Sequence, residues 1–470
     1  MCRRARSGVL VALVLAVASS ARAGDVSVRL DAGAGFSVRN NTGATERLRV
    51  HEATGNISRN GALFVHTTGM GSLYVGDGAG NPANTASGNT AVGPNALRSL
   101  ITGSQNSAFG SNALRDATIG ARNSAFGSVA LLRNTIGYDN SAFGAAALVE
   151  NTSGSRNSAL GSGALRYNSA GSDNAALGFG ALYYNFIGSS NAALGSRALF
   201  SNTTGYSNSA FGESALRYST TAPQNSAFGW SALRANTTGG GNSALGSFAL
   251  RENTTGGSNV GVGQTALRFN TVGSYNTALG RGSLYTSTSG SRNVAVGSGA
   301  GNGQTTGNDN IYLASAGVAG ESGRIRIGTV GTHTQAQVAG IHGATSAGGV
   351  GVLVNASGVL GTTTSSARFK RDVEDLGDAS DLLMRLRPVR FHYLEEAVGA
   401  EESRVAQYGL IAEEVAEVAP ELVAPDAEGR PYSVKYHVLP ALLLNKLQQQ
   451  ERTIASLSAR LAALETRAAR

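Results

Sequence analysis

Polar and apolar positions repeat every 17 residues along most of this chain. An Asn returns at each seventeenth position without an insertion, and most of these residues open the pattern N-[STAV]-[AG]-[FLV]-G-x-x-A-L, which Asn106–Leu114 shows in full. A fixed period of this kind predicts a solenoid-type array in which each repeat forms one coil of a stack. The repeated residues are Asn89, Asn106, Asn123, Asn140, Asn157, Asn174, Asn191, Asn208, Asn225, Asn242, Asn259, Asn276, Asn293 and Asn310.

One repeat predicts a short strand followed by a turn. Polar and apolar residues alternate in Asn106–Gly110, so we expect a strand with Ala108 facing one side and its neighbours the other. Two Gly positions, such as Gly103 and Gly110, mark where the backbone bends or takes a positive φ. The Ala-Leu pair is expected to point inward from the turn. At about 4.8 Å per stacked strand, these fourteen coils would form a rod of roughly 65 Å.

On both sides of the array, polar and apolar residues alternate less regularly, and this alternation also predicts β-strands. Residues 24–88 predict a β-rich leader, residues 89–313 the array and residues 314–364 a β-rich neck. After Thr364, Gly nearly disappears and charged residues dominate, which indicates a domain boundary. Strands are expected at Val26–Leu30, Leu48–Val50, Leu63–Val65 and Arg324–Ile327, and a hairpin at Val350–Leu360.

Residues 1–23 have the pattern of a secretory signal peptide. Three Arg among the first six residues precede an unbroken apolar run, Val9–Ala18, and Ala21–Ala23 is a small-x-small cleavage site. The run is shorter than the ~20 apolar residues that span a bilayer. The sequence therefore predicts a secreted or cell-surface protein with no membrane span after the signal is removed.

Composition excludes several classes of protein. With 64 Gly but only 8 Pro in 470 residues, and no Gly at every third position, the chain is not collagen. A single Cys excludes a disulfide scaffold, and the six His show no ligand spacing, so we expect neither metal nor cofactor. Without the four Arg of the signal, 34 basic residues face 30 acidic ones, which is no indication of a nucleic-acid partner.

An outward column of Arg is the candidate binding surface of the array. It lies nine residues after the repeated Asn, with Tyr183, Phe200 and Tyr285 at other steps. Arg and aromatic side chains together can hold anionic sugars by bidentate hydrogen bonds and stacking, which favours a surface glycan or another cell-surface receptor. The alternative, which the sequence favours, is a solvated face that keeps the rod soluble. The column contains Arg98, Arg115, Arg166, Arg217, Arg234, Arg251 and Arg268.

Two other roles for the array are disfavoured. A glycan depolymerase needs paired carboxylates in a groove, and no recurrent register is expected for the acids of the regular repeats, which are Asp116, Asp139, Glu150, Asp173, Glu213 and Glu252. Four N-x-[ST] sequences are interpreted as repeated turn residues rather than glycosylation sites, and they begin at Asn151, Asn202, Asn236 and Asn253.

The alternating Ala and Gly of residues 89–313 resemble the heads of trimeric autotransporter adhesins, whose N-x-A-x-G-type repeats form a trimeric parallel β-roll. The resemblance implies an adhesive or structural fibre made of three chains.

The candidate chemistry lies in the C-terminal part. All three Lys of the chain, Lys370, Lys435 and Lys446, lie beyond residue 364, and Lys370 follows Ser365 by five residues. A desolvated Lys amine can act as a general base, which Arg cannot, and a Ser hydroxyl needs such a base to become a nucleophile. Taken alone, this spacing is weak, and a surface Lys is the simpler interpretation.

Five ordered segments strengthen the interpretation of this region, and they are Ser365–Val373, Leu386–Phe391, Tyr408–Val415, Pro420–Val423 and Val434–Tyr436. Together they resemble the self-cleaving intramolecular chaperone domain of endosialidases and phage tail spikes, the S74 peptidase family. The resemblance implies a Ser-Lys dyad that cuts the chain once, just before the Ser, after a homotrimer has folded. It makes Ser365 the nucleophile, Lys370 the base and Thr364–Ser365 the scissile bond.

Two alternatives stay open at this site. Ser366, where many members of the family have Asp, is the other candidate nucleophile. The second alternative concerns whether the domain cuts the chain at all, because a domain that does not cleave would remain attached as a permanent trimer clamp. No activity on other molecules is expected.

The chain ends in a predicted helix. The seam Leu443, Leu447, Ile454, Leu457, Leu461 and Leu464 has alternating spacings of 3 and 4 when Gln450 is included, which predicts a coiled coil over residues 439–470. The alternative is a single amphipathic helix packed on its own domain. The predicted fold is therefore mainly β, a 17-residue-repeat β-solenoid or β-roll rod, followed by a small α+β chaperone domain (residues 365–438) and the coiled-coil helix.

Overall fold

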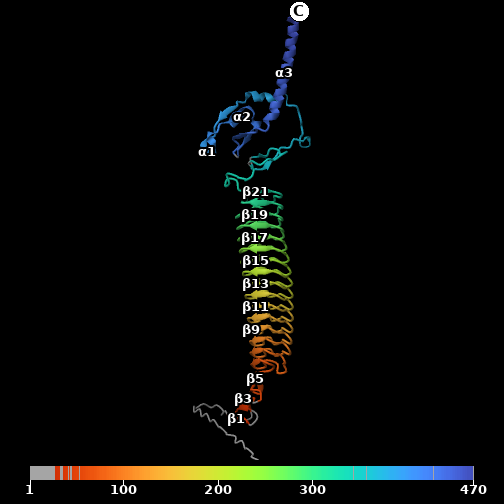
Figure 1. Cartoon of the computed structure of the whole chain (residues 1–470), viewed down its shortest axis with the longest axis vertical. Coiled ribbons are helices and arrows are strands. Elements are labelled where there is room, and N and C mark those ends of the chain that lie inside the picture. The colour runs from red at the N-terminus through yellow and green to blue at the C-terminus, as the bar shows by residue number, and fades with distance from the viewer. Residues whose placement is uncertain are drawn as a thin grey trace, which may run out of the picture. The chain divides into compact units, whose positions relative to one another are not determined.

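The structure of this protein, a computed structural model, describes residues 27–31, 35–40, 42, 45–51, 53–341, 343–355, 357–426 and 428–468. The predicted signal peptide, residues 1–23, lies outside the described residues. The chain divides into two compact units, one ending at Ala336 and one beginning at Gln337 (Figure 1). This division falls inside the predicted neck, residues 314–364.

The first unit begins with an antiparallel meander in the leader. Its strands pair in chain order, and the fifth strand pairs antiparallel with β6 (Leu73–Val75). The strands are β1 (Ser27–Asp31), β2 (Gly35–Arg39), β3 (Glu46–Val50), β4 (Ile57–Arg59) and β5 (Ala62–His66).

From β6 onward, each strand pairs in parallel with the strand of the next coil, and the stack forms a β-solenoid (Figure 1). The register advances by 17 residues, so that Ala108 lies opposite Ala125, until β21 pairs Ile325 with Ile311 after a shorter coil. The strands are β7 (Thr90–Val92), β8 (Ser107–Phe109), β9 (Ser124–Phe126), β10 (Ser141–Phe143), β11 (Ser158–Leu160), β12 (Ala175–Leu177), β13 (Ala192–Leu194), β14 (Ser209–Phe211), β15 (Ser226–Phe228), β16 (Ser243–Leu245), β17 (Val260–Val262), β18 (Thr277–Leu279), β19 (Val294–Val296), β20 (Ile311–Leu313) and β21 (Ile325–Ile327).

Each coil closes around small side chains. Ala108, Ala113 and Leu114 are fully buried, which confirms that the strand centre and the Ala-Leu pair point inward. Leu114 has a left-handed φ of 49°, a conformation that costs an L residue roughly 1 kcal/mol or more. Its N–H donates to the Ala130 carbonyl of the next coil (3.0 Å), so stacking and burial of the side chain offset the strain.

The two Gly positions are required by the close approach of successive coils. Gly110 has a φ of +137°, and an added Cβ would lie 2.5 Å from the Gly127 carbonyl oxygen. Gly120 belongs to the other position, where φ is not positive, but a Cβ there would lie 2.6 Å from the Gly137 carbonyl oxygen. The positive φ thus favours Gly at the position of Gly110, and the close packing of successive coils requires Gly at both positions.

Two columns of buried Asn run through the stack. The backbone N–H and Nδ2 of Asn106 donate to Oδ1 of Asn89 (2.9 and 3.1 Å), and Nδ2 also donates to the Gly120 carbonyl (2.9 Å). In the second column, Nδ2 of Asn151 donates to Oδ1 of Asn134 (2.6 Å). The four Asn of the N-x-[ST] sequences belong to this second column and are fully buried, so they are ladder residues and the folded coil does not present them for glycosylation.

A Tyr closes the core at each end of the regular coils. Tyr74 and Tyr312 lie opposite Ala91 and Ala295 of the neighbouring coils, and both are fully buried. Gly80 replaces the core Leu in the coil of Tyr74, and Gly301 replaces it in the coil before Tyr312; a Cβ at either position would collide with the Tyr ring. The ring thus fills the volume of the missing Leu, as expected for terminal coils that lack one neighbour. The regular coils therefore begin one repeat earlier than Asn89, with Ser72 at the Asn position.

The second unit is a small α+β domain with a small core of Val415, Ala419, Leu422, Val423, Val434 and Leu442. Strands β22 and β23 form the hairpin predicted for the neck. The elements are β22 (Leu353–Val354), β23 (Leu360–Gly361), 3-10 helices at Ala367–Phe369, Gly377–Arg385, Glu402–Arg404 and Pro420–Leu422, β24 (Val389–Phe391), α1 (Glu395–Val398), β25 (Gln407–Gly409), α2 (Ala412–Val418), β26 (Val423–Pro425), β27 (Pro431–Val434) and α3 (Leu439–Ala468).

Candidate functional site

The predicted scissile bond lies in an exposed, extended segment. Thr364 and Ser365 belong to no helix or strand, and the 3-10 turn Ala367–Phe369 follows at once, with Lys370 as its C-terminal cap. Every side chain from Gly361 to Lys370 is exposed. Two residues further on, Asp372 has a left-handed φ of 52°, a conformation that Asp adopts more readily than most L residues.

Ser365 and Ser366 have different surroundings. The Ser366 Oγ accepts hydrogen bonds from the backbone N–H and the Nε of Arg368 (3.4 and 3.2 Å), because Ser366 caps the 3-10 turn. Within the described residues, the Ser365 hydroxyl has no hydrogen-bond partner and makes no bond to Lys370. The two predicted dyad residues therefore lie in one short segment, but a single chain does not join them.

The three Lys also differ. Lys435 Nζ donates to the Glu421 carbonyl (3.0 Å), and Lys446 Nζ pairs with Asp381 (2.5 Å), so both hold the domain together. The ammonium of Lys370 has no hydrogen bond or ion pair within the described part of the chain. Of the three Lys, Lys370 is therefore the one whose amine has no partner in the described residues.

The other predicted segments meet in the domain fold. Val389 pairs with Gly409 between β24 and β25, and the Leu410 N–H donates to the Tyr436 hydroxyl (2.8 Å). Arg387 forms an ion pair with Glu414 of α2, and the hydrogen bonds from this guanidinium lower the pKa of the Glu414 carboxyl. The Arg387–Glu414 pair was not foreseen from the sequence, although each partner lies inside one of the five segments.

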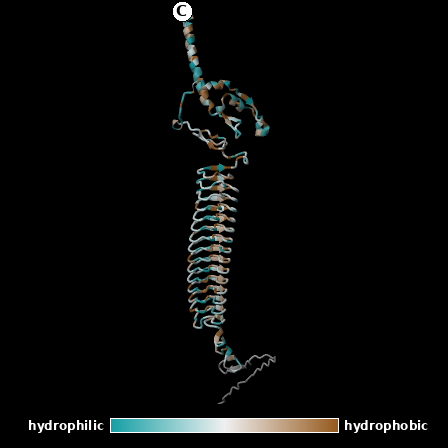
Figure 2. Cartoon of the chain, turned by 180° about the vertical axis from the view of Figure 1, so that it is seen from behind, coloured by the Kyte–Doolittle hydropathy of each residue, from teal (hydrophilic) through white to brown (hydrophobic). Residues whose placement is uncertain are grey.

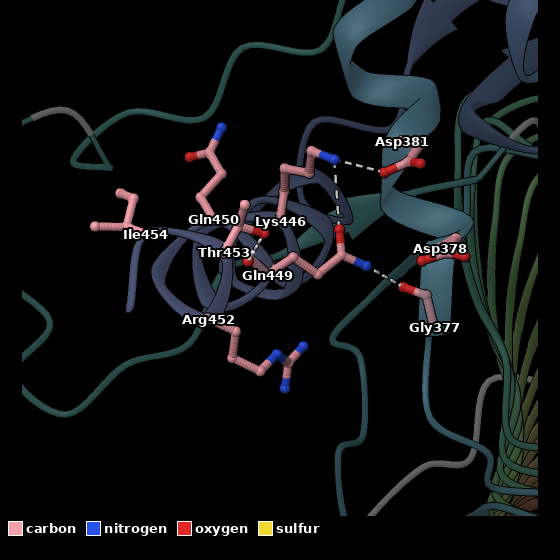
Figure 3. A pocket seen from close by; sticks show the side chains of 9 residues that line it. All are labelled: Gly377, Asp378, Asp381, Lys446, Gln449, Gln450, Arg452, Thr453 and Ile454. Atoms are coloured by element: carbon pink, nitrogen blue, oxygen red, sulfur yellow. Dashed lines mark hydrogen bonds and ion pairs between the residues drawn. The ribbon is translucent and has the colours of Figure 1, made fainter. Parts of the chain in front are cut away.

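Two of the hollows on the described part of this domain contain neither Ser365 nor Lys370. One, of about 720 Å³, is polar and lies where α3 meets the 3-10 helix Gly377–Arg385. There Gln449 Nε2 donates to the Gly377 carbonyl (2.6 Å), and Lys446 reaches Asp381 (Figure 3). The other, of about 540 Å³, is apolar, and its walls include Leu386, Tyr408 and Leu443.

The array leaves a continuous apolar column on the outside of its sheet. The last residue of each strand faces outward and is Phe, Leu or Val from β7 to β20, with exposures of 40% at Phe143, 51% at Leu160 and 53% at Leu245. No charged residue occupies the outward strand positions over the same coils. The predicted alternation, with Ala108 on one side of the strand and its neighbours on the other, was the signal for this column, although no exposed apolar surface was predicted from the sequence.

The side chains of the predicted Arg column have different surroundings. Arg98 is exposed and donates to Asn95 (3.3 Å), and Arg115 forms an ion pair with Asp116 (2.8 Å). The other five are half-buried and lie over aromatic rings of their own or neighbouring coils. These five are Arg166, Arg217, Arg234, Arg251 and Arg268.

The acids of the array do share registers, contrary to the expectation from sequence. Asp139 and Asp173 occupy one position of the coil, and Asp116, Glu150 and Glu252 another. Each of these five carboxylates pairs with an Arg, at distances of 2.6 to 3.2 Å. Hydrogen bonds from Arg122 and Arg156 lower the pKa values of Asp139 and Asp173, whereas the general acid of a glycosidase has a raised pKa.

Residues 365–424 match the family model described as Peptidase S74, chaperone of endosialidase. The match confirms the family expected for the C-terminal segment, and a domain of this kind suggests a fibre-like protein that carries an intramolecular chaperone. No curated protein and no solved structure matches the chain. Among the described residues, no helix is both long and apolar enough to cross a membrane, and no three His, Cys, Asp or Glu side chains gather as a metal site.

Proposed function

We propose that this protein is an exported, homotrimeric fibre of the tail-fibre or adhesin kind. Its C-terminal domain acts as an intramolecular trimerisation chaperone and then cuts the chain between Thr364 and Ser365 with a Ser365–Lys370 dyad. The observation that carries the proposal is the amount of apolar surface that one chain leaves uncovered in both units. The Peptidase S74 match of residues 365–424 supports the chaperone role.

The uncovered surface is largest on α3. Within the described residues, every side chain from Glu451 to Ala468 is exposed, including Leu457 at 55% and Leu461 at 58%. A helix with a Leu and Ile seam at heptad spacing stabilises itself by packing that seam against other copies. The interpretation of α3 as a helix packed on its own domain holds only for its first turns, where Leu442 is buried.

The small core of the second unit likewise indicates that its apolar surface needs other copies of the chain to cover it. Six buried apolar residues form its core, while Phe369, Leu394 and Tyr408 are 66%, 71% and 79% exposed. A domain that buries so little apolar surface gains little free energy on folding by itself. Association of three copies would cover the α3 seam and the apolar hollow beside Tyr408. The outward strand column of the array is a further surface for contact between copies. In Figure 2, hydrophobic colour recurs along the stacked coils of the array.

The proposed cleavage uses only groups of this chain and water. The Lys370 amine takes the proton of the Ser365 hydroxyl while Oγ attacks the Thr364 carbonyl carbon. The Lys370 ammonium returns this proton to the Ser365 nitrogen as the C–N bond breaks, so that the amine is freed and the acyl group is held as an ester on Oγ. Water hydrolyses the ester, which yields a Thr364 carboxylate and a new N-terminus at Ser365.

Assembly is the step that would switch this chemistry on. In the single chain, Lys370 is exposed and does not contact Ser365, so the proposed pair is not assembled for the reaction. Packing against another copy would desolvate the amine and bring the pair together. Removal of the chaperone after folding would then make unfolding of the fibre practically irreversible. The alternative is a non-cleaving adhesin in which the domain stays as a clamp, and the exposed Lys370 is compatible with it.

Intact masses of the denatured full-length protein test the cleavage. We expect the parent to split before Ser365, and Ser365→Ala and Lys370→Arg to slow the cut by about 100-fold or more, because they remove the nucleophile and the base. Ser366→Ala and Lys435→Arg are matched controls that should cut like the parent. An uncut parent favours the permanent clamp, and a cut in Ser365→Ala assigns the reaction to another residue or protease.

A further inference from the structure

Four Arg follow one another in the same position of consecutive coils. Arg217, Arg234, Arg251 and Arg268 come nine residues after the repeated Asn of β14 to β17 coils. Coils in a parallel stack repeat every ~4.8 Å, so the four positive charges lie in a short, regular row. We call this row and its aromatic neighbours Tyr218, Phe248 and Phe269 the basic stripe.

Aromatic rings hold these guanidinium groups in place. Tyr218 lies between Arg217 and Arg234, with ring distances of 5.2 and 5.0 Å, and its hydroxyl accepts from Arg234 (3.2 Å). Phe248 lies beside Arg251 and Arg268, at 5.3 and 5.2 Å. The Nε atoms of Arg217, Arg251 and Arg268 are buried without a hydrogen-bond partner. Cation–π contacts and packed side chains thus fix the charges before any ligand arrives.

Three of the four Arg of the basic stripe are not neutralised by a carboxylate of the described residues, although Arg–Asp ion pairs occur elsewhere in the array. In another column of the same stack, Arg122 and Arg156 each meet an Asp of the next coil at 2.6 Å. In the basic stripe, Arg251 contacts Glu252 (3.2 Å), while no carboxylate of the described residues lies within salt-bridge distance of Arg217, Arg234 or Arg268. Like charges stacked on neighbouring strands repel one another, so the stripe keeps an unfavourable arrangement that a bound polyanion would relieve.

We propose that the basic stripe binds a linear polysaccharide that carries carboxylate or sulfate groups. A row of regularly spaced charges fits a polymer with repeated anions better than one compact anion, and Arg forms bidentate hydrogen bonds with such groups. Rings exposed along the row, with Tyr218 at 40%, Phe269 at 38% and Trp230 at 53%, offer flat apolar faces to sugar rings. Trp230 continues the stripe through its contact with Phe248 (4.5 Å between centroids). The inference goes beyond the proposed cleavage and does not depend on it.

Binding of the full-length protein to immobilised polysaccharides tests this assignment. The probes are hyaluronate for carboxylate, dextran sulfate for sulfate, neutral dextran, and oligo-dT as a nucleic acid. We expect binding to one or both anionic polysaccharides and none to dextran. The combined variant Arg217→Gln, Arg234→Gln, Arg251→Gln and Arg268→Gln should weaken that binding at least tenfold. The matched control, Arg122→Gln, Arg156→Gln, Arg197→Gln and Arg281→Gln, removes the same charge elsewhere and should bind like the parent.

A second variant separates stacking from charge. Tyr218→Leu with Phe269→Leu keeps the four Arg and should weaken binding to the polysaccharide without changing its salt dependence. Equal losses in the two Arg variants would overturn a specific site, and so would the absence of binding to either anionic polysaccharide. Tighter binding of oligo-dT at the same salt concentration would replace the proposal with a nucleic-acid site. Native mass measurements on each variant, which report trimer formation separately, distinguish this failure from failure of the fibre proposal.

Discussion

At the scale of single residues, the buried Asn is the most constrained side chain of the array. Oδ1 of Asn157 accepts from the backbone N–H of Asn174 (3.1 Å), and its Nδ2 donates to Asn140 Oδ1 (3.1 Å) and to the Gly171 carbonyl (2.8 Å). One amide therefore links three successive coils. Only a short side chain with both a donor and an acceptor can continue the column in both directions, because an unpaired polar group in this core costs free energy.

We expect Asn157→Ala to lower the free energy of unfolding by about 1–3 kcal/mol, because it leaves the backbone N–H of Asn174 unpaired in the core and removes the bonds from Nδ2 to Asn140 and Gly171, which keep other donors. Chemical denaturation followed by circular dichroism measures the change. Ser162→Ala, an exposed substitution in the same coil, is the control and should change the free energy by less than ~0.5 kcal/mol. A change of that small size in Asn157→Ala would contradict the importance of the ladder.

At the scale of elements, one coil has almost no stability of its own, and contacts between coils decide which positions vary. Columns that face inward keep Asn, Ala, Leu and Gly, whereas the outward position before the repeated Asn accepts many residue types. Arg and Asp follow one another in that position only over residues 122–173 and 292–309, where Arg156 meets Asp173 at 2.6 Å and Arg292 meets Asp309 at 2.6 Å. Ion pairs between coils therefore add to the stability of the stack only where neighbouring coils carry opposite charges.

These ion pairs predict that the stability of the array depends on pH. Hydrogen bonds from the Arg of the preceding coil lower the pKa values of Asp139, Asp173 and Asp309 in the folded array. Their contribution to stability is therefore complete above the ordinary Asp pKa of about 4 and is lost as the pH falls through the lowered folded values. The pairs are exposed, so the effect of each on stability is small.

Thermal unfolding at several pH values measures this contribution. Arg156→Gln should lower the Tm slightly at pH 7 and by less at acid pH, as the pH falls through the lowered pKa of Asp173 in the parent. Arg197→Gln, which removes an Arg without a carboxylate partner in the described residues, should not show this pH dependence. An equal fall in Tm for Arg156→Gln at both pH values would mean that the Arg acts by packing instead.

At the scale of the whole molecule, the chain combines a long stack of parallel strands with a C-terminal helix that has an exposed seam. Long parallel stacks assemble slowly and expose strand edges while they form. Three helices that associate early would raise the local concentration of the chains and align them before the array is complete. The proposed fibre assigns a role to each exposed apolar surface, including the strand column and the α3 seam.

We expect Leu457→Asp to abolish trimer formation, because it places a charge in the seam of α3 at a residue that is 55% exposed in the single chain and supports no core of its own. Light scattering and native mass spectrometry of the full-length protein measure the assembly. Ser456→Asp, next to the seam, is the matched control and should leave a trimer.

The same pair of variants connects assembly with chemistry. If desolvation of Lys370 needs neighbouring copies, Leu457→Asp should also stay uncut, whereas Ser456→Asp should cut like the parent. A parent that behaves as a single chain in solution would contradict the fibre. A trimeric Leu457→Asp would assign assembly to the array or to the domain instead of α3.

The sequence by itself determined the repeat, the inward residues and the C-terminal family. Strict 17-residue spacing leaves parallel in-register stacking as the simplest way to bury Ala108 and Leu114, and the ordered segments after Ser365 carry the family without any coordinates. Local chemistry also sufficed for the α3 helix. These features depend on spacing along the chain, which a sequence displays directly.

Other features were decided only by the tertiary structure, because they depend on which side chains meet across coils or segments. Tyr74 replaces an Ala only because Gly80 leaves room for its ring, so the first regular coil escaped detection. The Asn of the N-x-[ST] sequences proved to be core residues once their neighbours were in place. Whether an Arg is neutralised depends on the residue that the next coil places beside it. Arg156 has a carboxylate partner there, whereas Arg217 has none among the described residues. The exposure of Ser365 and Lys370 likewise follows from the small core of one chain.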